Sequence, residues 1–181
     1  QSESITLHHV QAMLTLSWQD LLGWFAPNDG TPDQFRDGVH YDYHLLKSCI
    51  KAMPAKTDIV EIGSYAGRSA FAMLEMLEAI NRSAMIYCYD PYRPGTEAES
   101  AGKLPIREIC YSFRAKIEDH GHGRIVLNET DSALGAAIYP GKPVGLLHVD
   151  GDHTYVQVLA ELEAWRPYLA KYCAVVFDDW L

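Results

Sequence analysis

Three titratable side chains crowd around one glycine in the stretch HVDGDHTY, residues 148–155. Asp150, Asp152 and His153 come soon after the apolar run at 144–147. Charged groups at the mouth of an apolar element cost free energy when they are buried without partners. We therefore expect water, a cation or a ligand to meet these side chains.

A second acidic pair, Asp178 and Asp179, follows the apolar run at 173–177. If this run and the one before Asp150 form neighbouring parallel strands, about 4.8 Å apart, the three carboxylates can converge on one ion. Hard divalent cations favour clusters of oxygen ligands. The two acidic stretches are therefore a candidate site for a divalent cation.

The segment IVEIGSYAGRSA, residues 59–70, has the pattern of a strand, a tight turn and the start of a helix. Gly63 and Gly67 stand where the backbone must turn sharply or approach a ligand. A plain strand-to-helix turn would explain the two glycines, but it poorly explains the carboxylate of Glu61 at the end of a central strand. A cationic or amino-bearing ligand would explain that carboxylate. The dinucleotide pattern GxGxxG is absent, because Tyr65 lies between the glycines.

Two further motifs follow the next predicted strands. The stretch MIYCYD ends in Asp90, at the position where Rossmann-like folds place an acid that holds ribose hydroxyls. The stretch NETDS offers Asp131 and Ser132 at the same level. This pair is equally typical of a helix N-cap, so both interpretations are kept.

From Asp58 onward, short apolar runs alternate with longer helical patterns, which is typical of βαβ units. Strands are expected at about residues 58–62, 85–89, 124–128, 144–149 and 173–178. The predicted fold is α/β, a doubly wound Rossmann-like parallel sheet of strand order 3-2-1-4-5 with helices on both faces. Such sheets bind ligands outside the carboxyl ends of their strands, where every motif above falls.

Two helices of this core can be delimited from their apolar patterns. Residues 69–81 are apolar on almost every side, which predicts a buried helix. An amphipathic helix is predicted from apolar residues that recur at helical spacing: Tyr155, Val158, Leu159, Leu162, Trp165 and Leu169.

Residues 1–56 are expected to form an N-terminal helical extension on a core domain of residues 57–181. An aromatic-rich helix at about 14–25, a loop at 27–38 and a second helix at 41–53 make up this extension. We expect the first helix to pack on the core rather than on a membrane or a second subunit, because it lacks the basic face of a lipid-binding helix.

The composition favours one soluble domain, with 48% hydrophobic and 22% charged residues in a chain of 181. The formal net charge of -9 and the scattered basic residues argue against a nucleic-acid partner. Apolar stretches are too short to span a bilayer, so no membrane association is expected. The four cysteines are far apart in the sequence and form no CxxC pair: Cys49, Cys88, Cys110 and Cys173. This pattern indicates reduced thiols and a cytoplasmic location.

Together these motifs resemble a class I S-adenosylmethionine-dependent methyltransferase. They are most similar to the metal-dependent small-molecule O-methyltransferases, including those that act on catechols and on sugars of natural products. The resemblance covers about residues 40–181 and consists of five motifs in order: 61–69, Asp90, 131–132, 150–153 and 177–179. It implies an enzyme that moves a methyl group to a hydroxyl of a small molecule or sugar.

The resemblance also implies which residues bind the cofactor. They are Glu61, Gly63, Ser64, Tyr65, Gly67, Ser69, Asp90, Asp131, Ser132 and Asp150. Residues of the glycine turn would surround the methionine end of S-adenosylmethionine. Asp90 would bind its ribose, and Asp131 with Ser132 its adenine.

For the reaction, the resemblance implies Asp150, Asp178 and Asp179 as ligands of a divalent metal, with magnesium expected. Methyl transfer needs the acceptor oxygen deprotonated, or nearly so, and held about 3 Å from the methyl carbon. His153 is the implied general base beside the catalytic Asp150, and an ordinary histidine pKa of about 6.5 suits proton removal at neutral pH. In the plain structural alternative His153 is a surface residue of a first helical turn. Asp152 is assigned to a helix cap.

Two other functions share parts of this pattern. A non-catalytic module that binds S-adenosylmethionine, or that serves as an interaction domain, would keep the same cofactor pocket. An NAD-type oxidoreductase would share the architecture, but it predicts the GxGxxG turn that this sequence lacks.

The sequence departs from the family pattern near its end. Lys171-Tyr172-Cys173 replaces the usual glycine-rich turn, and no strands follow Leu181, so we expect a C-terminally truncated core. The flat apolar strand at 173–177 would then form an open edge, which proteins rarely leave uncovered. We expect a segment beyond Leu181 as the cover, with the N-terminal extension or a second subunit of a homo-oligomer as alternatives.

Overall fold

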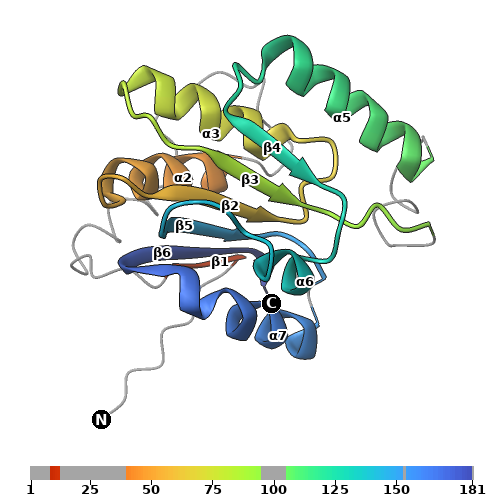
Figure 1. The fold of residues 1–181 in the computed structure, drawn as a ribbon. Helices are drawn as coiled ribbons and strands as arrows, with labels where there is room; N and C mark the ends of the chain where they lie inside the picture. The colour runs from red at the N-terminus through yellow and green to blue at the C-terminus, as the bar shows by residue number, and fades with distance from the viewer. Residues whose placement is uncertain (1–8, 13–39, 95–104, 153, 181) are drawn as a thin grey trace.

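The computed structural model describes residues 9–12, 40–94, 105–152 and 154–180. Six strands form one sheet in the order β1-β6-β5-β2-β3-β4 (Figure 1). Their bounds are His9–Ala12 for β1, Asp58–Ile62 for β2, Ile86–Tyr89 for β3, Ile125–Asn128 for β4, Val144–Val149 for β5 and Leu169–Trp180 for β6. Strands β2 to β6 run parallel to one another, and β1 pairs antiparallel with β6.

The five parallel strands confirm the predicted doubly wound order. The chain starts the parallel sheet at β2, adds β3 and β4 on one side, and then adds β5 and β6 on the other. The order therefore reverses between β2 and β5. Open α/β sheets bind their ligands at this reversal, outside the carboxyl ends of the strands.

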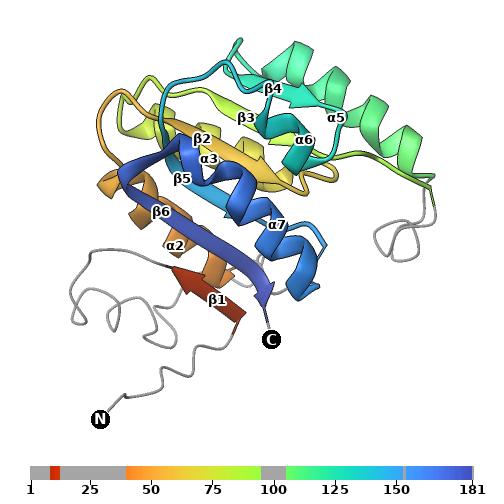
Figure 2. The same cartoon turned by 60° about the horizontal axis from the view of Figure 1, so that its bottom comes forward.

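Helices cover both faces of the sheet (Figure 2). On one face pack α2 (His40–Ala52), α3 (Arg68–Ala79) and α5 (Ile106–His120); on the other pack α6 (Ser132–Ala136), α7 (Tyr155–Trp165) and the 3-10 helix η2 (Arg166–Tyr168). Successive residues of a strand point to opposite faces. Ile59 and Cys88 accordingly belong to the first core, whereas Val60 and Tyr89 belong to the second.

The structure corrects the predicted helix at Tyr155 to Leu169. The α-helix ends at Trp165, and a 3-10 turn that contains Pro167 follows it. Proline has no backbone N–H to continue the α-helical pattern, which explains the break. Leu169 is already part of β6, and Tyr155 is 69% exposed instead of buried.

Strand β1 covers the last part of the open side of β6, at residues 176–180. Its backbone pairs His9 with Trp180 and Ala12 with Val176. The N-terminal extension, one of the expected alternatives, therefore covers part of the predicted open edge, and the extension is not wholly helical. Helix α2 confirms the second predicted helix of this extension, while the aromatic-rich helix at 14–25 lies outside the described residues.

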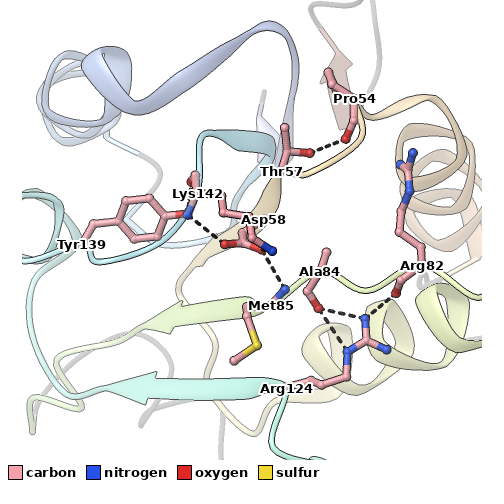
Figure 3. A network of polar contacts seen from close by, with 9 residues as sticks. All are labelled: Pro54, Thr57, Asp58, Arg82, Ala84, Met85, Arg124, Tyr139 and Lys142. Atoms are coloured by element: carbon pink, nitrogen blue, oxygen red, sulfur yellow. Dashed lines mark hydrogen bonds and ion pairs between the residues drawn. The ribbon is translucent and has the colours of Figure 1, made fainter.

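A polar network ties together the amino ends of the strands (Figure 3). The buried carboxylate of Asp58 accepts the N–H of Met85 at 3.0 Å and the N–H of Lys142 at 2.9 Å. The guanidinium of Arg124 donates to the carbonyl of Ala84 at 2.8 Å. A shallow pocket lined by Pro54 to Thr57 and Ile80 to Ser83 opens at this same edge. This end of the sheet lies away from all of the predicted site residues.

All four cysteines lie in the described part of the chain. Cys49, Cys88 and Cys110 are buried free thiols, and Cys173 is a partly buried one. No helix in the described part of the chain is long and apolar enough to cross a membrane.

Candidate functional site

The carboxyl ends of the parallel strands lie along one edge of the sheet, which we call the carboxyl rim (Figure 1). It consists of the residues that follow β2 to β5, together with the end of β6: 63–67, Asp90, 129–131, 150–152 and Asp178. The parallel arrangement therefore brings to one edge the five motifs that are scattered over the sequence.

The turn after β2 requires its two glycines. Gly63 and Gly67 have φ angles of 82° and 75°, in the left-handed region that favours glycine. A Cβ atom at Gly63 would overlap the main-chain carbonyl of Asp150, and one at Gly67 would overlap the ring of Phe113. The predicted sharp turn is confirmed, and Gly63 also lets the β2 and β5 loops touch at the point where the strand order reverses.

Asp90 holds this turn from the end of β3. Its Oδ2 accepts the N–H of Tyr65 at 2.9 Å, and its Oδ1 accepts the N–H of Tyr92 at 2.8 Å. Burial raises the pKa of Asp90, and these two N–H bonds oppose that effect in part. The residue assigned to the cofactor ribose is thus also a structural link between two loops of the rim.

Glu61 lies fully buried beneath the turn. It stands between Cys88 and His148 in the sheet register, with Oε1 3.3 Å from His148 Nδ1 and Oε2 3.5 Å from Cys88 Sγ. Burial works to raise the pKa of Glu61, but the hydrogen bond and charge of His148, helped by Ser69, outweigh it and lower that pKa. The carboxylate therefore sits in a buried ion pair, and its predicted contact with a ligand amino group stays a prediction.

His148 is the other half of this pair. Burial works to lower its pKa, but the hydrogen bond and charge of Glu61, followed by the charges of Asp150 and Asp178, outweigh it and raise the pKa. Its Nε2 atom is buried and has no hydrogen-bond partner among the described residues. His148 thus lies buried below the acidic part of the rim, with its pKa raised in favour of the charged imidazolium.

Two of the three carboxylates predicted to bind metal follow neighbouring strands. Val149 of β5 pairs with Phe177 of β6, so Asp150 and Asp178 follow at the same level on neighbouring strands. The charges of both carboxylates contribute to the raised pKa of His148. The side chain of Asp179 and all of His153 fall outside the described residues. Within the part that is described, no three His, Cys, Asp or Glu side chains are arranged to hold a metal ion.

Asp131 and Ser132 do not use their side chains to cap α6. Asp131 occupies the N-cap position without a side-chain cap bond, and its carboxylate pairs with Arg93 at 2.5 Å. Ser132 Oγ instead donates to Glu161 Oε1 of α7 at 2.8 Å. The carboxylate of Asp131 is thus free of a capping role and lies beside the loop that carries Asp90.

The prediction that Asp152 caps the following helix is wrong, because its side chain binds the turn before α7. Its Oδ1 accepts the N–H of Thr154 at 2.8 Å, in the turn that leads into α7. Thr154 itself is the N-cap residue of that helix, so Asp152 shapes the entry to the helix rather than its first turn.

Sequence reasoning missed four residues that shape the rim: His148, Glu161, Tyr92 and Arg93. His148 could have been identified from the sequence, because it is a titratable residue in a predicted buried strand, two positions before Asp150. Glu161 could also have been identified, because it is an acid at an inward-facing position of an amphipathic helix. In the structure it is only 3% exposed. Tyr92 and Arg93 lie in a loop, where a single sequence carries no such periodic signal.

The structure is similar to solved methyltransferases of low sequence identity. NovP, an O-methyltransferase, gives a TM-score of 0.58 at 18% identity, covering 76% of this chain and 64% of NovP. PaMTH1 of Podospora anserina, solved with bound S-adenosylhomocysteine (SAH), gives 0.56 at 18% identity, covering 90% of this chain and 62% of PaMTH1. CalS11, a TDP-rhamnose 3'-O-methyltransferase of calicheamicin biosynthesis, gives 0.51 at 21% identity, covering 89% of this chain and 75% of CalS11. These likenesses show the class I methyltransferase fold.

Sequence comparison shows the family. The uncharacterized protein y4gI of Sinorhizobium fredii is 29% identical over 121 residues, which are 67% of this chain and 13% of that protein. The chain thus spans a small part of y4gI and somewhat less than two thirds of NovP. The family model described as a methyltransferase domain matches residues 60–180, from the middle of β2 to the end of β6. With this match over more than half of its length, and with its motifs on the carboxyl rim of a doubly wound sheet, the chain belongs to the methyltransferase domain family.

Proposed function

We propose that the protein transfers the methyl group of S-adenosylmethionine to a hydroxyl group of a small molecule or sugar, assisted by a divalent cation. The observation that carries the proposal is the gathering of the glycine turn, Asp90, Asp150 and Asp178 along one carboxyl rim. A cofactor site and a candidate ion site would then lie next to each other, as the proposed metal-assisted transfer requires. That NovP and CalS11 are O-methyltransferases with this fold supports the choice of acceptor atom.

The cofactor would lie across the reversal of strand order. Each oxygen of Asp90 already accepts one N–H, but a carboxylate has about four acceptor positions, so positions remain for the ribose hydroxyls. Asp131 would accept the adenine amino group, because its present partner Arg93 is an exposed side chain that can yield. The negative charge of Glu61, buried under the glycine turn, would attract the amino group of the methionine end.

Asp150, Asp178 and Asp179 would hold the divalent cation. The two described carboxylates follow neighbouring strands at one level, and their hard oxygen atoms suit magnesium. A cation held there would polarise the acceptor hydroxyl and lower its pKa. His153, three residues after Asp150, would accept the proton that the hydroxyl releases.

The direct test is methyl transfer itself. The purified chain is incubated with methyl-labelled S-adenosylmethionine, magnesium and a panel of catechols, other phenols and sugar nucleotides. Label is expected on a hydroxyl oxygen of at least one compound, and mass spectrometry of the product locates it. Label on nitrogen or carbon alone would refute the choice of acceptor. Cofactor binding without any transfer would favour the non-catalytic module instead.

A further inference from the structure

Tyr92 makes an unusual contact from the loop after β3. Its ring is 1% exposed and packs in the core under α3 and α5, while its hydroxyl donates to the main-chain carbonyl of Tyr65 at 2.6 Å. The bond joins residues that are far apart in the sequence and that follow two neighbouring strands. A core side chain thus reaches the glycine turn through one hydroxyl group.

The same turn residue is held from a second side. The N–H of Tyr65 is bound by Asp90 Oδ2 at 2.9 Å, and Asp90 Oδ1 accepts the N–H of Tyr92 at 2.8 Å. Asp90 and Tyr92 therefore fix both peptide groups of Tyr65, one through its N–H and one through its C=O. We call these three residues the Tyr65 clamp.

The clamp holds Tyr65 in a conformation that it would not adopt freely. Tyr65 has φ of 43° and Tyr92 has φ of 45°, in the left-handed region that costs free energy for residues with a Cβ atom. Burial raises the pKa of Tyr92, which keeps its hydroxyl protonated as a donor. Such strain persists only where the surroundings hold it, and it clusters at binding sites.

We infer that Tyr92 is a positioning residue for the methionine end of the cofactor: its hydroxyl holds Tyr65 and the glycine turn in the shape that binds. The inference rests on the proposed function, because it assigns the turn to S-adenosylmethionine. Tyr92 acts through Tyr65, since its own hydroxyl is occupied and its ring is in the core. The adenine end of the pocket, around Asp131, does not depend on this bond.

The test removes one oxygen atom. Tyr92→Phe keeps the ring, and Tyr139→Phe is the matched control, because Tyr139 donates its hydroxyl to the carbonyl of Lys142, also at 2.6 Å, at the far edge of the sheet (Figure 3). Calorimetry measures the affinity for SAH and for methylthioadenosine, which lacks the amino-acid end. Tyr92→Phe is expected to weaken SAH binding at least about tenfold and methylthioadenosine binding less than about twofold. Tyr139→Phe is expected to change neither affinity beyond about twofold.

Other outcomes decide against the inference in separable ways. Equal losses for both ligands, or no loss, with Tyr92→Phe would overturn it while leaving the proposed function intact. A wild-type chain that binds no SAH would overturn both. A second measurement repeats Tyr92→Phe in a Tyr65→Gly background, because glycine adopts positive φ without support. The effect on SAH affinity should shrink below about threefold there, and an undiminished effect would contradict a role through Tyr65.

Discussion

Asp90 and Glu61 occupy positions that the family resemblance assigns to the cofactor, yet each is also bonded to the protein. Asp90 accepts two backbone N–H groups, and Glu61 pairs with His148. Side chains that hold one another keep their orientation before a ligand arrives, which lowers the entropy cost of binding. The residues of the site are therefore positioned by bonds that the sequence alone does not reveal.

Gly63 gives the first prediction at this scale. Gly63→Ala should abolish SAH binding and lower the melting temperature, because its Cβ atom would overlap the carbonyl of Asp150. Gly123→Ala is the control, since Gly123 has φ of 68° but no atom within 4 Å of an added Cβ. The control should cost about 1 kcal/mol of stability and leave binding unchanged. Calorimetric binding with thermal melting checks both variants, and a Gly63→Ala protein that binds normally would contradict the account of the turn.

Asp178 gives the second prediction. Asp178→Asn should lower turnover by about a hundredfold at saturating magnesium, because a neutral amide holds the cation poorly, and should leave SAH affinity unchanged. Asp119→Asn removes an exposed carboxylate from α5 and serves as the control. Initial rates before and after chelation complete the measurement. Full turnover of the wild-type chain in excess chelator would rule out the metal role.

At the scale of elements, β1 turns the N-terminal extension into part of the sheet. Without it, one side of β6 would expose backbone N–H and C=O groups to other chains. A chain that starts at residue 13 should therefore self-associate, whereas a chain that starts at residue 9 keeps β1 and should not. Light scattering at matched concentrations compares the two. Equal mass and solubility for both chains would show that β1 does not protect the edge.

The Glu61 and His148 pair links β2 to β5 and makes their joint stability depend on pH. The raised pKa of His148 contributes stability that is complete below its ordinary value of about 6.5 and is lost as pH rises through the raised value. The lowered pKa of Glu61 contributes stability above its ordinary value of about 4.3, which is lost as pH falls through the lowered one. Both contributions are therefore complete between these two values.

This gives a prediction for urea unfolding. From about pH 6 to about pH 9, the wild-type chain should lose more unfolding free energy than His148→Gln does. His122→Gln is the control, because the pair of His122 with Glu78, 2.7 Å apart, is exposed and is expected to contribute little. If His148→Gln keeps the pH dependence of the wild type, the buried pair is not charged as described.

At the scale of the whole molecule, the sequence predicted what depends on periodicity. The strands at 58–62 and 144–149 and their order in the sheet follow from alternating apolar runs and from the handedness of βαβ units. The positions of the rim residues could also be predicted, because the ends of the strands can be identified from the sequence. The contacts among the rim residues could not be predicted from the sequence. The Tyr65 clamp and strand β1 depend on loops and on a chain terminus, which have no repeating pattern.

The function rests on one claim about the whole rim, that it binds the adenosyl cofactor. Isothermal titration of the purified chain with SAH tests this claim most directly, with reduced nicotinamide cofactor as the comparison ligand. The account predicts saturable heat for one SAH molecule per chain and none for the nicotinamide cofactor. A folded chain that gives no heat with either SAH or S-adenosylmethionine, or that binds the nicotinamide cofactor instead, would contradict it.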